Sequence, residues 1–176
     1  DRMMLGSPFP KYTIGITNNL SYKGFNLSFM VNVVQGVSTL DVNTLESLYP
    51  INTYRNRYSS VWLNRWTPQH PTNAYPSLIN SANYGGALSV NSLDVVDASY
   101  VRLQNVTLSY MFSFLRTQSL KSLSVYLAGD NLLTFTRFKG YDPDANDSYV
   151  GNSATLEKAN YNSFPLSRSF RFGVTV

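Results

Sequence analysis

Five stretches of the chain alternate apolar and small polar residues with a period of two. In the first stretch, Tyr12, Ile14 and Ile16 alternate with threonine and glycine. Successive residues of a β-strand point to opposite faces, so each stretch predicts a strand with one apolar and one polar face. The five predicted strands cover residues 10–22, 25–36, 100–112, 122–134 and 166–176.

The links between these strands alternate between short and long. Lys23 and Gly24 between the first two strands predict a tight hairpin turn, because glycine readily adopts a positive φ. Residues 113–121 form a moderate link, whereas residues 37–99 and 135–165 are long. Short periplasmic turns and long extracellular loops are typical of outer-membrane β-barrels. Each strand also has about the 10 residues that a tilted strand needs to cross a bilayer.

The apolar positions change phase once within the third predicted strand. Val101 and Leu103 have odd numbers, whereas Val106 and Leu108 have even numbers. A shift of one residue predicts a β-bulge near Gln104, or a strand that starts after a kink there.

The long segments contain features that need their own explanation. Residues 44–48 predict a helical turn, and residues 56–65 predict a short amphipathic helix because Tyr58, Trp62 and Trp66 recur at helical spacing. The two tryptophans either stack on a sugar ring or pack within the loop or on a partner, and the helical spacing favours packing. A group of acidic residues from Asp142 onwards lacks the glycine and distal glutamate of a calcium loop, which favours a solvated turn.

Composition excludes several classes of protein. The chain has no cysteine and one histidine, which excludes a disulfide framework, a thiolate zinc site and a His-rich metal site. The formal charge is +4 and the cations are scattered, so no basic stripe for nucleic acid is present. No apolar run is long enough for a transmembrane helix. No catalytic constellation surrounds His70 or the pair Asp94 and Asp97, so we expect neither an enzyme nor a cofactor.

Five strands are too few for a membrane barrel. A sheet edge in lipid leaves backbone groups without hydrogen-bond partners, and the smallest membrane barrels have about 8 strands. If the strands face lipid, the chain is therefore a fragment, and its missing strands belong to the rest of the same protein or to another chain.

Six groups of residues, in order along nearly the whole chain, resemble SusC/RagA-type TonB-dependent outer-membrane transporters. They are Pro10-Lys11-Tyr12-Thr13 with residues 20–28, Arg65-Trp66-Thr67-Pro68 with His70-Pro71-Thr72, residues 97–110, residues 130–136, Lys139-Gly140-Tyr141-Asp142-Pro143, and residues 164–170 with 172–174. Each motif is weak alone, and their shared order makes the resemblance specific.

This resemblance implies an all-β fold, in which residues 1–176 form about the last five strands of a 22-stranded antiparallel transmembrane β-barrel. It implies a location in the outer membrane of a Gram-negative bacterium and contact with the lipid bilayer. The implied partners are the remaining strands and plug of the transporter, a SusD-like surface lipoprotein, and the TonB complex, which is reached through the missing N-terminal part. The implied activity is import of oligosaccharides or peptides.

The resemblance also assigns two groups of aromatic residues. Tyr12, Tyr22, Phe25, Phe112 and Phe135 lie near predicted strand ends and are expected at the membrane interface. Trp62, Trp66, Tyr75 and Tyr141 are loop residues expected to contact substrate or the lipoprotein. The alternative hypothesis is a soluble, secreted β-sandwich that binds carbohydrate through its loop aromatics. In that fold the apolar files would be buried against a second sheet.

Overall fold

The computed structural model describes residues 3–48, 56–77, 92–112, 122–146 and 158–176. The chain forms two compact units. The strand unit comprises Phe9–Val37, Ala98–Lys139 and Pro165–Val176. The loop unit comprises Asp1–Pro8, Ser38–Asp97 and Gly140–Phe164, so it combines both long loops with the start of the chain.

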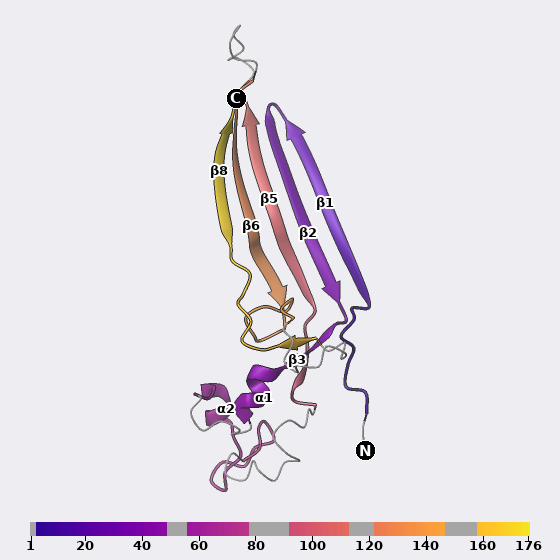
Figure 1. The fold of residues 1–176 in the computed structure, drawn as a ribbon, viewed down its shortest axis with the longest axis vertical. Coiled ribbons are helices and arrows are strands. Elements are labelled where there is room, and N and C mark those ends of the chain that lie inside the picture. The colour runs from indigo at the N-terminus through magenta and orange to yellow at the C-terminus, as the bar shows by residue number, and fades with distance from the viewer. Residues whose placement is uncertain (1–2, 49–55, 78–91, 113–121, 147–157) are drawn as a thin grey trace. The chain divides into compact units, whose positions relative to one another are not determined.

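The strand unit is a five-stranded sheet in the order β1-β2-β5-β6-β8 (Figure 1). Its strands are β1 (Tyr12–Tyr22), β2 (Phe25–Gln35), β5 (Tyr100–Met111), β6 (Ser124–Thr136) and β8 (Ser169–Thr175). All four pairings are antiparallel. Within the described residues β1 and β8 each pair with one neighbour, so the sheet has two open edges.

Each of these strands corresponds to one of the five predicted from alternation. Strand β6 runs two residues past the predicted end at 134, and β8 begins three residues later than predicted. The hairpin turn is confirmed, because Lys23 has a φ of 45° and Gly24 a φ of 87°. Two positive φ values are the geometry that matches the twist of the flanking strands.

The predicted bulge in the third strand is also confirmed. The register between β2 and β5 shifts between Met30 and Val31, which leaves Gln104 without an opposite residue on β2. The register between β5 and β6 shifts at the same place, where Asn131 has a φ of 53°. The bulge keeps the apolar residues on one face although their numbering changes from odd to even.

The loop unit contains a small sheet that alternation did not predict. Strand β3 (Ser38–Asp41) pairs antiparallel with β4 (Val95–Asp97) and parallel with β7 (Ala159–Asn160). Because β7 comes from the second long loop, this sheet joins the two loops through backbone hydrogen bonds. Leu40, Val42 and Ala159 are buried together beside it.

Two helices follow β3 in the loop unit. Helix α1 (Val42–Leu48) starts where the carboxylate of Asp41 accepts hydrogen bonds from the backbone N–H and the hydroxyl of Thr44. Helix α2 (Ser59–Leu63) lies inside the range predicted from helical spacing. In the described part of the chain, neither helix has the length and apolarity to cross a membrane.

Candidate functional site

Strand register separates the residues of the sheet into an apolar and a polar face. Directly opposite residues in antiparallel strands share a face. The apolar face contains Ile14, Ile16 and Leu20 of β1, Leu27, Phe29, Val31 and Val33 of β2, Val101, Leu103, Val106 and Leu108 of β5, Val125, Leu127 and Leu133 of β6, and Phe170, Phe172 and Val174 of β8. Asn18, opposite Phe29, interrupts this face.

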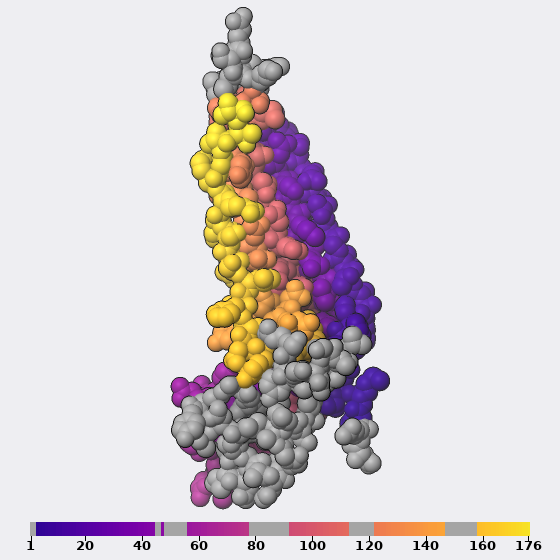
Figure 2. Space-filling view, in the orientation of Figure 1, coloured from indigo at the N-terminus to yellow at the C-terminus, as the bar shows by residue number. Residues whose placement is uncertain are grey.

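The apolar face is largely exposed. Phe170 and Phe172 are 72% and 73% exposed, and Ile16 and Leu127 are each about half exposed. Figure 2 shows one face of this unit, with side chains of neighbouring strands lying side by side along the sheet. No second sheet within the described residues pairs with it, since the other sheet is the short one in the loop unit. This exposure is the opposite of what the β-sandwich hypothesis requires.

Aromatic residues stand at both ends of the apolar face. Tyr22 and Phe25 lie opposite each other at the hairpin, and Lys23 lies 5.2 Å from the centroid of the Tyr22 ring. The ring of Tyr110 contacts those of Phe25 and Phe112, with centroid distances of 4.5 and 4.8 Å.

Tyr12 and Phe135 lie at the other end of the strands. Tyr12 and Tyr22 are the first and last residues of the 11-residue strand β1. At about 3.3 Å per residue their separation is roughly 33 Å along the strand. A strand tilt near 40° reduces this to about 25 Å, the height of the apolar band of outer-membrane barrels.

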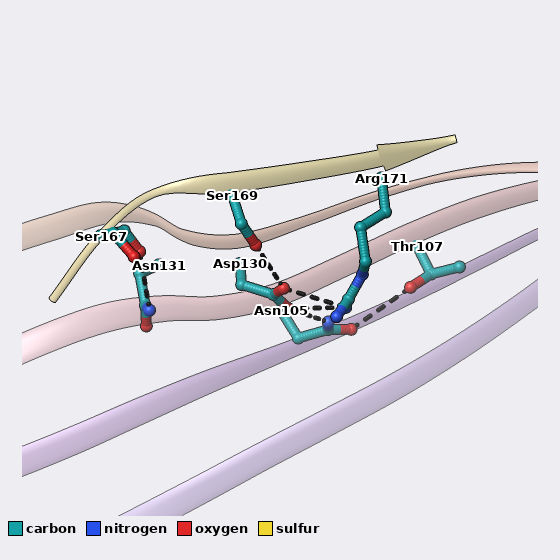
Figure 3. A network of polar contacts seen from close by, with 7 residues as sticks. All are labelled: Asn105, Thr107, Asp130, Asn131, Ser167, Ser169 and Arg171. Carbon is teal, nitrogen blue, oxygen red and sulfur yellow. Dashed lines mark hydrogen bonds and ion pairs between the residues drawn. The ribbon is translucent and has the colours of Figure 1, made fainter. Parts of the chain in front are cut away.

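The polar face carries a network of side chains that links β5, β6 and β8 (Figure 3). The carboxylate of Asp130 accepts hydrogen bonds of 2.7 Å from Asn105 Nδ2 and 2.7 Å from Ser169 Oγ. Arg171 Nη2 pairs with the same carboxylate at 2.9 Å. Thr107 Oγ1 donates a weaker bond of 3.4 Å to Asn105 Oδ1. Asp130 thereby ties three neighbouring strands together on the polar face.

The bulge positions this network. Asn105 follows the bulged Gln104, and Asp130 precedes Asn131, whose positive φ bends β6 at the same level. Without the extra residue, Asn105 would lie on the apolar face, because a one-residue slip moves every side chain to the other face. Asn131 Nδ2 also donates a hydrogen bond of 3.2 Å to the backbone oxygen of Ser167, and this bond holds the segment that leads into β8.

A tyrosine covers a glycine on the same face. Tyr126 lies directly opposite Gly173, and a Cβ added at Gly173 would come within 2.5 Å of the Tyr126 ring. The Tyr126 ring therefore fills the space that the glycine leaves between β6 and β8.

Asn43 joins the two long loops where α1 begins. Its Nδ2 donates hydrogen bonds of 3.4 Å to the backbone oxygen and to Oδ1 of Asn160. Its Oδ1 accepts a hydrogen bond of 3.2 Å from the backbone N–H of Asn162. Thr39 adds a bond of 3.1 Å to the backbone oxygen of Lys158. These contacts hold β7 against β3 and α1, so the two loops form one body.

The loop tryptophans are exposed rather than packed inside the loop unit. Trp62 is 52% and Trp66 41% exposed, whereas Val61 of α2 is buried with 1% exposed. Of the two kinds of packing that the helical spacing favoured, packing inside the loop is therefore wrong, because α2 is short and buries Val61 instead of its aromatic residues. Packing on a partner stays a prediction. The Arg65 guanidinium lies 3.6 Å from the centroid of the Trp62 ring and also donates to the backbone oxygen of Trp62.

Tyr75 lies close to this pair of tryptophans along the backbone. The backbone N–H of Trp66 donates a hydrogen bond of 2.9 Å to the backbone oxygen of Tyr75. Arg65 and Tyr75 form an isolated parallel β-bridge. Between them, Thr67 and His70 exchange backbone hydrogen bonds of 3.2 and 3.0 Å around a tight turn. This turn fixes the backbone that presents Trp66.

Tyr141 is the fourth predicted loop residue, and it is 71% exposed. Burial is the main cause that raises the pKa of the Tyr58 hydroxyl, and the nearby Asp41 and Tyr141 raise it further. The structure therefore brings Trp62, Trp66 and Tyr75 into one segment and places Tyr141 in the electrostatic surroundings of Tyr58.

The acidic segment near Tyr141 forms a turn, but its first residue, Asp142, is buried, so the predicted solvated turn is confirmed only as a turn. Asp142 Oδ1 accepts a hydrogen bond of 2.9 Å from the backbone N–H of Asp144, and the backbone oxygen of Asp142 accepts one of 3.3 Å from the N–H of Ala145. The described residues hold no group of three or more candidate metal-ligating side chains. Asp147 lies outside the described residues.

Two curated relatives align with the whole chain. TonB-dependent receptor P3 of Formosa agariphila is 31% identical over 180 residues, and TonB-dependent receptor P26 of the same organism is 33% identical over 186 residues. The chain spans 17% and 18% of their lengths. No family model matches the chain.

Solved structures share the fold. The RagAB peptide importer in its open-open state has a TM-score of 0.76 at 24% identity, over 96% of this chain and 17% of the matched chain. The RagAB peptide transporter has a TM-score of 0.69 at 23% identity, over 92% of this chain and 16% of the matched chain. These relatives are named receptors, importers or transporters rather than enzymes.

An antiparallel sheet with an exposed apolar face, a polar face and two open edges matches a fragment of a β-barrel. Over its whole length the chain is similar to part of proteins named TonB-dependent receptors, in agreement with the family that the six sequence motifs predicted. Transporters of this kind lie in the outer membrane of Gram-negative bacteria.

Proposed function

We propose that the chain forms part of the wall of a 22-stranded outer-membrane importer that takes up oligosaccharides or peptides with a SusD-like surface lipoprotein. In this proposal the apolar face meets lipid and the polar face lines the lumen. The N-terminal part of the same protein supplies the other strands, the plug and the contact with the TonB complex.

The exposed apolar face, bounded by two open edges, is the observation that carries this proposal. Burying a side chain of the size of leucine or phenylalanine is worth about 1.5–3 kcal/mol, and many such side chains on this face remain exposed in the chain alone. Lipid provides that burial without a second sheet. The open edges of β1 and β8 require neighbouring strands, because lipid offers no hydrogen bonds to a sheet edge.

The aromatic residues give the proposed orientation. Tyr22, Phe25 and Phe112 lie near the hairpin turn and the moderate link, which supports our assigning them to the periplasmic interface. Tyr12 and Phe135 lie at the opposite end, where both long loops begin, which supports our assigning them to the extracellular interface. Aromatic rings are enriched at both edges of the membrane because their amphipathic bodies suit the headgroup region.

The loop residues supply the proposed contact surface. Trp62 and Trp66 are exposed on a backbone that Arg65 and Tyr75 hold in place. Preorganised aromatic side chains bind with little loss of conformational entropy. With Tyr75 and Tyr141, they are the residues we assign to contact with the lipoprotein or with substrate.

Cysteine labelling tests the lipid and lumen faces. Single cysteines at Ile16 and Phe29 of the apolar face, and at Thr17 and Ser28 of the polar face, are placed in a cysteine-free full-length transporter in outer membranes. A membrane-impermeant maleimide should label positions 17 and 28 when the lumen is open to water, and leave positions 16 and 29 unlabelled. Equal labelling of both pairs would contradict the barrel-wall proposal.

Alanine variants test the loop surface in the full-length transporter. Trp62→Ala with Trp66→Ala should reduce co-purification of the lipoprotein or uptake of the cargo. Leu63→Ala is the matched control, because Leu63 is also exposed and lies beside Trp62 on α2. Unchanged uptake and unchanged co-purification in the double variant would remove these residues from the proposal.

A further inference from the structure

Asn18 is an amide side chain in the middle of an otherwise apolar surface. Among the positions that pair between the five described strands, it is the one polar side chain on the apolar face between the aromatic ends. It is exposed, and no hydrogen bond joins its side chain to a residue that the structure describes. An amide without a hydrogen-bond partner is costly in an apolar environment. Lipid around this face would therefore require a partner from outside the described chain.

Asn18 lies too far from the strand ends for headgroups to supply that partner. It stands six residues from Tyr12 and four from Tyr22, the aromatic residues at the two ends of β1. Four residues span about 13 Å along a strand, or roughly 10 Å along the membrane normal at a tilt near 40°. Long lysine and arginine side chains can extend to headgroups, but the asparagine side chain is short.

The described neighbours of Asn18 offer no hydrogen bond on the apolar face. The nearest positions of that face on β1 and β2 hold apolar side chains, namely Ile16, Leu20, Leu27, Phe29 and Val31. On its other side, β1 is the open edge of the sheet (Figure 1). A protein partner in the same sheet can therefore reach Asn18 only across that edge.

The strand expected at this edge is the one that precedes β1 in the complete protein. Within the large sheet, neighbouring strands follow the order in which the chain enters them, from β1 through β2, β5 and β6 to β8. Antiparallel membrane barrels continue in this way around the wall. Directly opposite residues of such strands have Cβ atoms about 4.5–5.5 Å apart, which suits a hydrogen bond between two short polar side chains.

We propose that Asn18 forms a hydrogen bond, on the lipid side of the barrel wall, with a polar side chain of the strand that precedes β1. The partner is a serine, threonine, asparagine or glutamine that lies directly opposite Asn18 or diagonal to it. The inference rests on the proposed function, because lipid around the apolar face is what makes the bond necessary. The bond also fixes the register of the two strands, since a slip would leave both polar groups in lipid without a partner.

The first test is the direction of the stability change in the full-length transporter. At a fixed high temperature in SDS, Asn18→Leu should speed loss of the folded form roughly tenfold, because the partner loses its hydrogen bond. Ile16→Leu is the matched control on the same strand and face, and its rate should stay unchanged. If Asn18 met lipid without a partner, leucine would instead slow unfolding. Unchanged or slower unfolding of Asn18→Leu would overturn the proposal.

The second test identifies the partner. In the cysteine-free transporter, a cysteine at position 18 should form a disulfide with a cysteine at one site of the preceding strand, which locates the opposite residue. Replacing the polar residue found there by valine in the Asn18→Leu variant should restore much of the lost stability, since no unpaired polar group remains.

Two further outcomes would also overturn the proposal. One is a preceding strand without a hydrogen-bonding side chain at the opposite and diagonal positions. The other is a changed oligomeric state of Asn18→Leu, because the partner would then belong to another chain. Protection of positions 16 and 29 from the maleimide reports separately on the barrel wall, and it does not depend on this hydrogen bond.

Discussion

The two units bury their apolar residues in different ways. The loop unit packs Leu40, Val42 and Ala159 together, and Val61 of α2 is buried as well, as in a small water-soluble domain. The strand unit leaves most of its leucine, valine and phenylalanine side chains on an exposed face. The loop unit therefore derives its stability from its own chain, whereas the strand unit depends on an apolar environment around it. Substitutions should affect the two units through different mechanisms.

The largest expected effect is a charge at the middle of the apolar face. In the full-length transporter, Phe29→Arg should lower the free energy of unfolding by about 2–4 kcal/mol, the cost of arginine near the bilayer midplane. Unfolding by guanidinium in lipid vesicles measures this change in the free energy of unfolding. Ser28→Arg, one residue away on the polar face, should cost much less. Similar losses for both variants would mean that the apolar face does not meet lipid.

A smaller loss is expected where β6 and β8 pack through a glycine. Gly173→Val should destabilise the transporter by about 1–3 kcal/mol, because the new side chain collides with the Tyr126 ring. Gly15→Val is the control, since the nearest atom to its Cβ is Met30 Cε at 4.0 Å. Adding Tyr126→Ala to Gly173→Val should recover part of the loss, and strict additivity in this double-mutant cycle would exclude the contact.

The loop unit should respond as a conventional core. Val42→Ala removes two buried carbons and should cost the loop unit about 1–2 kcal/mol. Hydrogen exchange should detect faster opening of β3 and β7, with protection of β1 and β2 unchanged. Leu63→Ala, at an exposed position of α2, should leave exchange in the loop unit unchanged. Faster exchange throughout β1 and β2 would show that the two units do not behave as separate bodies.

The smallest effect is expected in the polar network. Asp130→Asn keeps the shape of the side chain but removes its ion pair with Arg171, whose side chain is 60% exposed. Exposed pairs contribute about 0–1 kcal/mol, and weakened hydrogen bonds to Asn105 and Ser169 add a similar amount. Asp144→Asn, whose partner Lys158 lies 4.0 Å away, should change unfolding less. A larger loss for Asp144→Asn would reverse the ranking of the two ion pairs.

The strands and the bulge could be predicted because they depend on local alternation. Each strand of the large sheet has apolar residues at most of its alternate positions, and one phase change located Gln104. The small sheet could not be predicted in this way. Strand β7 has only two residues and pairs with β3 across more than 100 positions, so no local periodicity marks it.

The candidate site was predicted less well than the fold. Asp130 belongs to one of the six motifs and Arg171 lies between the two parts of another, but their pairing depends on the register between β6 and β8, across 41 positions. The helical spacing of Trp62 and Trp66 suggested a buried face, yet the short α2 buries only Val61 among its residues. Spacing alone does not indicate which side of a five-residue helix meets the rest of the loop.

The backbone ladder between β3 and β7 has a consequence for the diversity of such transporters. Thr39 and Lys158 are 119 residues apart, yet a direct hydrogen bond joins them. Exchanging one long loop between two relatives would pair β3 or β7 with a strand from a different transporter. Recombined transporters should therefore tolerate new loops best when both long segments are inherited as a pair.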